Sequence, residues 1–122
     1  MPYFTNTMSA IKIKRVYETA AKDEYRILVD RLWPRGLTKE QAAIDLWLKE
    51  IAPSPGLRKW FRHDPEKFLE FRTRYVEELA QNPTVAILSS LLTKHKKIAL
   101  VYAAKNEDIN HAAVLKGFME SR

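Results

Sequence analysis

Two short apolar segments flank a long stretch of helical periodicity, and this arrangement constrains the fold more than any other feature of the sequence. The segments cover residues 25–30 and 98–102, and their continuous apolar centres are typical of buried strands. Strands separated by long helical connections occur in α/β layered domains with at least one parallel pair. We therefore expect a small, single α/β domain in which a short mixed or parallel sheet is covered by several helices.

Capping residues and prolines divide the helical stretch into separate helices. Residues 38–41 have the spacing of a capping box, and apolar residues follow at helical period until Pro53. Ser54 and Asp64 each precede a proline, which places an N-cap directly before the first helical residue. Helices are therefore expected over residues 38–51, 55–61, 65–81, 85–95 and, with Asn106 as its N-cap, from 107 onward.

The start of the chain is expected to add one more strand. Residues 11–17 alternate apolar and polar side chains over their first positions, as a half-exposed strand does. The link to residues 25–30 is too short for a crossover helix, so these two strands would be antiparallel neighbours if they pair. Residues 1–10 lack the basic segment and apolar core of a signal peptide, so we expect a loose leader there and one domain over residues 11–122.

Composition excludes several classes of protein. The 122 residues include no cysteine, which excludes disulfides, thiolate metal sites and cysteine nucleophiles and suits the reducing cytoplasm. No apolar run approaches the roughly 20 residues that a membrane span needs. The formal net charge of +6 favours anionic partners. We therefore expect a cytoplasmic protein without membrane contact.

The second apolar segment ends in a charged turn, VDRLWPRG, at residues 29–36. In open α/β sheets, ligands bind beyond the carboxyl ends of parallel strands, where loops and helix N-termini meet. This strand delivers Asp30, Arg31 and Arg35 to that edge, and the last strand delivers Lys105. If the two strands are parallel neighbours, these residues would form an anion pocket. The alternative is that Asp30 and Arg31 only pair with neighbouring groups as the chain leaves the core.

Three further side chains could complete this pocket. Asn110 and His111 lie on the segment that follows Lys105, and His111 could serve acid–base chemistry beside Asp30. The apolar residues around that histidine fit the edge of a core equally well. Trp33 could stack on a planar ligand or could lie under Arg35 as a cation–π pair.

The remaining reactive residues form no familiar motif. His63 and Asp64 could form an acid–base dyad, but the carboxylate is more simply explained as the N-cap before proline. The three histidines lack the spacing of metal ligands, and the chain has neither a glycine-rich phosphate loop nor a nucleophile elbow. We expect no metal and no cofactor, and the sequence leaves open whether the protein is an enzyme.

Four segments, LVDRLWPRGLTKE, DLWLKEIAPSPGLRKWFRHDPEKF, FRTRYVEEL and LVYAAKNEDINHAAVL, resemble in the same order the motifs of the YeaO-like branch of the bacterial family called domain of unknown function 488. The resemblance extends from Ile11 to Phe118. It implies a small cytoplasmic α/β protein without an established activity. Arg62 departs from the family pattern, which often has glycine there. The motif positions are Asp30, Arg31, Trp33, Pro34, Arg35, Gly36, Trp47, Lys49, Pro53, Ser54, Trp60, Phe61, His63, Asp64, Pro65, Tyr102, Ala104, Lys105 and Asn110.

Two functions are compatible with these features. The first is a domain that binds a small ligand bearing phosphate or carboxylate, in which Arg31 clamps the anion and Lys105 neutralises its charge. Asp30 would then orient Arg31 or act as a base. The alternative is a nucleic-acid-binding accessory protein, which the net charge and the basic residues within 12–15 and 94–97 favour.

Overall fold

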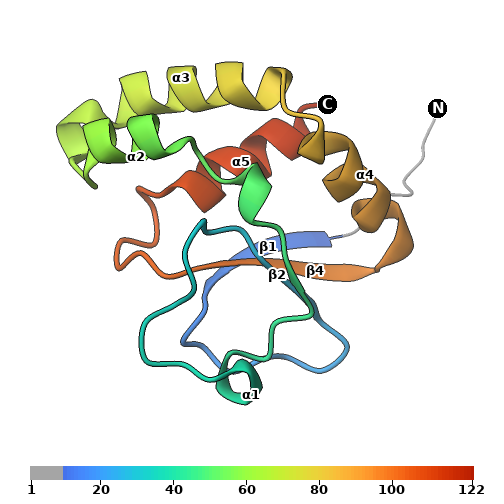
Figure 1. Cartoon of the computed structure of the whole chain (residues 1–122). Coiled ribbons are helices and arrows are strands. Elements are labelled where there is room, and N and C mark those ends of the chain that lie inside the picture. The colour runs from blue at the N-terminus through green and yellow to red at the C-terminus, as the bar shows by residue number, and fades with distance from the viewer. Residues whose placement is uncertain (1–9) are drawn as a thin grey trace.

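The computed structural model describes residues 10–122 and contains one four-stranded parallel sheet (Figure 1). This architecture confirms the expected small α/β domain. The predicted leader lies outside the described residues, apart from Ala10, which begins the first strand. The strands run in the spatial order β1-β4-β2-β3, and every pairing is parallel. They are β1 (Ala10–Arg15), β2 (Tyr25–Leu28), β3 (Leu46–Trp47) and β4 (Lys97–Tyr102).

The last strand lies in the middle of the sheet, between β1 and β2. β1 and β2 therefore do not pair with each other, and both run parallel to β4, so the antiparallel pair that was expected if they met does not form. Leu100 of β4 stands opposite Ile13 on one side and Ile27 on the other. β4 takes this position because Ile98–Tyr102 are all buried, and a strand that is apolar on both faces is most stable with a partner on each side. β2 and β4 are thus the parallel neighbours that the pocket hypothesis required.

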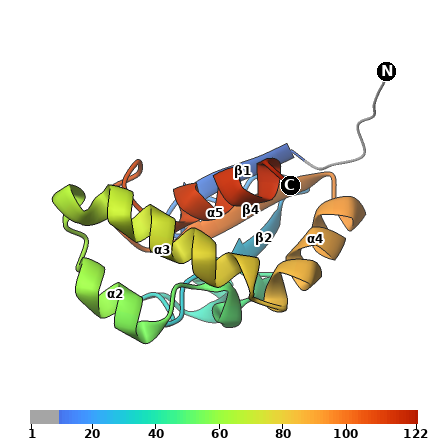
Figure 2. The ribbon, with the colours of Figure 1, turned by 90° about the horizontal axis from the view of Figure 1, so that it is seen from above.

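Four helices cover one face of the sheet, as Figure 2 shows from above. Ser54 and Asp64 act as N-caps, since their side chains accept hydrogen bonds from the backbone N–H groups of Leu57 and Glu66. Both caps confirm the predictions made from the proline pairs. The main apolar core lies between these helices and the sheet. The helices are α2 (Pro55–Phe61), α3 (Phe68–Ala80), α4 (Thr84–Lys94) and α5 (His111–Glu120), and a short 3-10 turn, η2 (Pro65–Lys67), precedes α3.

The helix expected over residues 38–51 is replaced by three shorter elements. The predicted capping box forms and α1 (Lys39–Ala42) begins there, but the helix ends at Ala43, which has a left-handed φ of 52°. β3 follows and pairs with β2, and a 3-10 turn, η1 (Lys49–Ile51), completes the segment. The backbone N–H of Arg26 donates to the Asp45 carboxylate at 2.8 Å. Hydrogen bonds to β2 therefore outweigh the helical periodicity, which is a weak preference by comparison.

The final helix begins later than the sequence predicted. The Asn106 side chain accepts hydrogen bonds from the N–H groups of Asp108 and Ile109 and so closes a turn instead of capping the helix. The N-cap is Asn110, whose side chain accepts from the N–H of Ala113 at 2.8 Å. The acidic residues at 107 and 108 consequently lie before the helix, and His111 is its first residue.

Candidate functional site

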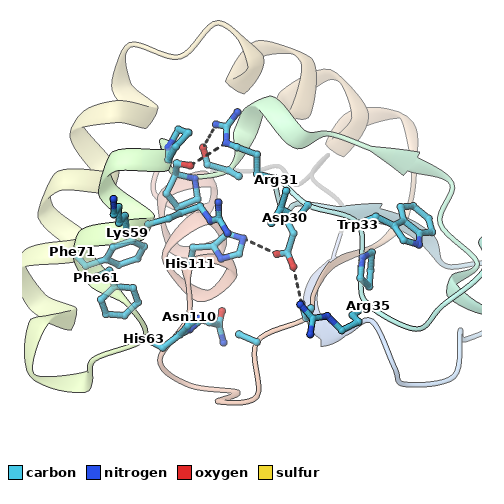
Figure 3. Close-up of a pocket in the computed structure, with 18 of the residues that line it drawn as sticks. Asp30, Arg31, Trp33, Arg35, Lys59, Phe61, His63, Phe71, Asn110 and His111 are labelled. Carbon is cyan, nitrogen blue, oxygen red and sulfur yellow. Dashed lines mark hydrogen bonds and ion pairs between the residues drawn. The ribbon is translucent and has the colours of Figure 1, made fainter.

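A cavity of about 730 Å³ lies beyond the carboxyl ends of β2 and β4 (Figure 3). Its walls come from residues 30–35 after β2, from α2 with the residues before it, and from residues 103–111 between β4 and α5. Ligand cavities of proteins have volumes of about 300 to 1,000 Å³. The cavity therefore has the location and the size that a small-molecule site on this fold would have.

Asp30 and His111 meet in this cavity. The Asp30 Oδ2 atom accepts a hydrogen bond from the N–H of Ala103 at 2.9 Å, and Oδ1 lies 3.1 Å from His111 Nε2. The same nitrogen lies 3.0 Å from the carbonyl oxygen of Val29. Because Nε2 faces two acceptors, it carries a proton in this arrangement. The contact with Val29 has the geometry of a hydrogen bond, whereas Oδ1 lies close to Nε2 but has no hydrogen-bond partner among the described residues. Both side chains are 16% exposed.

Arg31 lines the cavity, but its donors are used by the neighbouring chain segment. Nη2 donates to the carbonyl oxygen of Ala52 at 3.2 Å, and Nε approaches that of Pro53 at 3.4 Å. Nη1 lies 3.6 Å from a carboxylate oxygen of Glu50. All three guanidinium nitrogens thus hold residues 50–53 against the end of β2, which matches the alternative that this arginine pairs with nearby groups.

Two of three further predicted site residues line the cavity. These are Trp33 and Asn110, whereas Lys105 does not line it. The Trp33 indole N–H donates to the Leu37 carbonyl at 2.8 Å, and within residues 10–122 no cation lies over its ring, so the expected alternative of an Arg35 cation–π pair does not occur. Asn110 lines the cavity, but both ends of its amide are bonded within the loop and helix. Lys105 is exposed and does not line the cavity.

Three other cations line the cavity without a carboxylate partner. Arg35 comes from the turn after β2, and Arg58 and Lys59 come from α2. In the part of the chain that the structure describes, none of the three forms an ion pair. The helix is fixed by Ser54, whose N–H and hydroxyl donate to Glu78 of α3 at 2.9 and 2.6 Å.

Sequence reasoning found Arg35 but missed the two cations of α2. The helix itself was predicted correctly, together with its N-cap. What the sequence lacked was the direction of the helix relative to the sheet, which depends on contacts between α2 and α3. The only available signal was that two adjacent basic residues occupy exposed positions of a short helix within the family-like segment.

Aromatic rings line the cavity next to Lys59 of α2 (Figure 3). Phe61 and Phe71 stack with their ring centroids 4.1 Å apart, and His63 lies 6.2 Å from Phe61 (Figure 3). Arg62 and His63 have φ values of 52° and 58°, a left-handed conformation that costs a residue other than glycine about 1–2 kcal/mol. Asp64 caps the following turn, as predicted, and no hydrogen bond links it to His63 in the described structure.

The two basic segments lie differently with respect to the cavity. Lys14 pairs with Glu24 at 3.2 Å. Arg15 reaches the cavity wall, because its Nε atom donates to the Ala104 carbonyl at 3.0 Å and its guanidinium lies 5.1 Å from the centre of the Tyr17 ring. Residues 94–97 lie at the amino end of β4, the end remote from the cavity. Within residues 10–122, no group of three or more histidine, aspartate or glutamate side chains could hold a metal ion, and no helix is long and apolar enough to cross a membrane.

Comparison with known proteins identifies relatives over nearly the whole chain. A family model described as the inactive DUF488-N3 subclade matches residues 10–122. The uncharacterized protein YeaO of Escherichia coli (strain K12) is 46% identical over 112 residues, which cover 91% of this chain and 97% of YeaO. The uncharacterized protein Rv3073c of Mycobacterium tuberculosis (strain H37Rv) is 40% identical over 113 residues, covering 92% and 95% of the two chains. No solved structure matches the sequence significantly.

Proposed function

This chain belongs to the inactive DUF488-N3 subclade, and on that premise we propose that it is a binding domain for a small anionic ligand. The ligand would carry a phosphate or a carboxylate and would lie in the cavity beyond β2 and β4. The description of the subclade as inactive favours binding without chemical conversion. The absence of cysteine supports a cytoplasmic location for this binding.

The observation that carries the proposal is the set of three unpaired cations in one cavity. Arg35 and Arg58 would hold the anion through their planar guanidinium groups, and Lys59 would add a point charge. We assign the anion contact to these residues in place of Arg31 and Lys105, because Arg31 is bonded to residues 50–53 and Lys105 lies outside the cavity. Trp33 and Asn110 would shape the walls.

A second candidate is acid–base catalysis by Asp30 and His111, which their 3.1 Å approach favours. A carboxylate beside an imidazole fixes the orientation of the ring, and a ring held in this way can transfer a proton to a bound molecule. If the protein is a catalyst, His111→Ala abolishes conversion of the bound ligand and leaves its affinity nearly unchanged. If it is only a binder, a bound ligand is recovered chemically intact from the wild-type protein.

The test is a thermal-shift titration with inorganic phosphate, nucleotides and small carboxylic acids. A ligand at 100 times its dissociation constant stabilises the folded protein by about 2.7 kcal/mol, which gives a clear rise in the melting temperature. Arg35→Gln should remove this rise, whereas Lys96→Gln, which loses the same charge at the far end of the sheet, should retain it. Equal loss in both variants, or no saturable ligand, would overturn the proposal.

A further inference from the structure

A second hollow adjoins the cavity on the outer side of α2. Lys59 lines both, so the two depressions share a wall on this helix. The residues that line the second hollow are Gly56, Lys59, Trp60, Arg62 and Lys67. A ligand with charge at one end only would need the cavity alone. Two adjoining depressions with cations in each suit a longer anion.

The basic side chains Lys59, Arg62 and Lys67 form what we call the α2 track. Among the described residues none of the three forms an ion pair. Lys67 is held in place, because its Nζ atom donates to the Trp60 carbonyl at 3.0 Å and lies 5.1 Å from the centre of the indole ring. The positive charge of the track is therefore available to a ligand.

Among the described residues, the acidic side chains near the track form no ion pair with it. Asp64 accepts a hydrogen bond from the backbone N–H of Glu66 and caps the η2 turn. Glu70 pairs with Arg74 on the next turn of α3. Glu66 is exposed and lines neither the cavity nor the second hollow. Among the described residues that line the two depressions, Asp30 is the one carboxylate, against six lysine and arginine side chains.

Two exposed rings line the mouth of the cavity. Tyr17 is 46% exposed, and its hydroxyl donates to the Arg35 carbonyl at 3.1 Å. The Arg15 guanidinium lies 5.1 Å from the ring centre, so one face of the ring carries a cation. His63 is also exposed and is held toward the cavity by the left-handed turn at residues 62–63. Aromatic side chains beside a positive groove are the usual platform for unpaired bases, and each stacked base contributes about 1–3 kcal/mol. An acidic peptide would gain nothing comparable from these rings.

We propose that the natural ligand of this site is the phosphorylated end of a single-stranded nucleic acid. The terminal phosphate would lie in the cavity near Arg35 and Arg58, and the next phosphates would follow the α2 track. The inference rests on the proposed anion site and extends it to a polymeric ligand.

The experiment compares a mononucleotide, a dinucleotide and a tetranucleotide of one base, each with a terminal phosphate, by calorimetric titration at several salt concentrations. Affinity should rise with length, and the slope of log affinity against log salt should steepen by about 0.7 for each added phosphate contact. A tetranucleotide without its terminal phosphate should bind more weakly. A polyglutamate peptide of similar length should also bind more weakly.

The double variant Arg62→Gln with Lys67→Gln separates the two proposals. It should weaken tetranucleotide binding severalfold and leave mononucleotide binding unchanged, whereas Arg35→Gln should weaken both. Lys96→Gln is the control for net charge, and urea unfolding checks that each variant folds.

The outcomes distinguish the two proposals. If length adds no affinity while the mononucleotide still binds, the α2 track is refuted and the anion site stands. If no phosphate compound binds, both proposals fail. Equal binding of polyglutamate, or of the unphosphorylated tetranucleotide, refutes the nucleic-acid end as ligand.

Discussion

Two charged clusters of the molecule differ in how their charges are balanced. Lys14, Glu24 and Arg26 form a network on β1 and β2, in which both cations lie within 3.2–3.5 Å of the same carboxylate oxygen. Arg35, Arg58 and Lys59 of the cavity, by contrast, have no carboxylate partner within the described chain. A buried charge must be paired, because it has lost its water, whereas an exposed charge keeps its hydration until a ligand replaces it.

The two clusters also differ in burial. Arg26 is 1% exposed, and its guanidinium donates to the carbonyl oxygens of Val16 and Ala42, which ties the turn after β1 and the end of α1 to β2. Arg58 is exposed, and within residues 10–122 its guanidinium forms no ion pair. The network therefore contributes to folding, and the cavity cations are free to contribute to binding. The two clusters should respond in opposite ways to the same kind of substitution.

Arg26→Ala should have the largest effect on stability. The substitution leaves the carbonyl oxygens of Val16 and Ala42 without a donor and removes one of the two cations beside Glu24. Breaking a buried ionic network in this way costs about 3–5 kcal/mol. Urea unfolding at neutral pH measures the loss. A loss below about 1 kcal/mol would show that water reaches the network, and the contrast with the cavity would then disappear.

Asp30→Ala should reduce stability by an intermediate amount. This carboxylate lines the cavity, but it has partners within the protein, as the groups of the buried network do. The Ala103 N–H loses its acceptor and His111 loses its ionic partner. An unsatisfied buried donor costs about 1–3 kcal/mol. Anion affinity, measured in parallel, should stay the same or rise, since a negative charge leaves the cavity. A strong loss of affinity with intact folding would instead make this aspartate part of the ligand contact.

The pH dependence of stability should report on Glu24. Burial raises the pKa of this carboxyl, but the hydrogen bonds from the Ala21 N–H and Lys14, together with the charges of Lys14 and Arg26, lower it below the ordinary value of 4.5. A carboxyl with a lowered pKa stabilises the fold above its ordinary pKa, and this contribution is lost as the pH falls through the folded-state value. Urea unfolding between neutral pH and about pH 3 should show a loss that begins near the ordinary value.

Glu24→Gln is the control for this pH effect. The amide carries no negative charge at any pH, so it cannot form the ion pairs with Lys14 and Arg26. The variant should therefore be less stable than the wild type at neutral pH, and its stability should not show the loss that protonation of Glu24 causes at acidic pH. Carboxylates elsewhere will still cause some acid destabilisation in both proteins. Superimposable stability curves for the two proteins would show that the network does not contribute to the pH dependence.

Local signals in the sequence predicted the elements that are held by local contacts. The N-caps Ser54 and Asp64 form within two or three residues of their partners, and both were predicted. The buried stripe of α3, with Phe71 and Tyr75, follows from helical spacing alone. The edge of the sheet that carries the cavity was also predictable, because Asp30 follows β2 directly and ligands of this fold class bind there.

The features that the sequence did not reveal depend on distant contacts. β3 exists because Leu46 and Trp47 pair with β2. The hydrogen bond between Arg26 and Asp45, which joins the same segments, spans 19 residues of the chain. The order of the strands depends on which strand buries both faces, a property of the assembled sheet. The approach of Arg58 to the cavity likewise depends on the packing of α2 against α3. Such contacts leave no periodic pattern in a single sequence.

The smallest change in stability is expected for the cations of α2. In the double variant Arg58→Gln with Lys59→Gln, both positions are exposed and unpaired, so the free energy of unfolding should change by no more than about 0.5 kcal/mol. The affinity for a phosphate-bearing ligand should nevertheless fall about tenfold or more, because a hydrogen bond to a charged group contributes about 1.5–3 kcal/mol. Urea unfolding and calorimetric titration of the same samples test both statements.

The double variant Arg72→Gln with Lys96→Gln is the control. It removes equal charge from exposed positions outside the cavity and should change neither the stability nor the affinity. If the cavity variant unfolds as readily as Arg26→Ala, its cations are part of the fold and the distinction between the two clusters is wrong. If it is stable and loses affinity, unpaired charge in this protein marks the binding surface, and the paired network marks the scaffold that holds it.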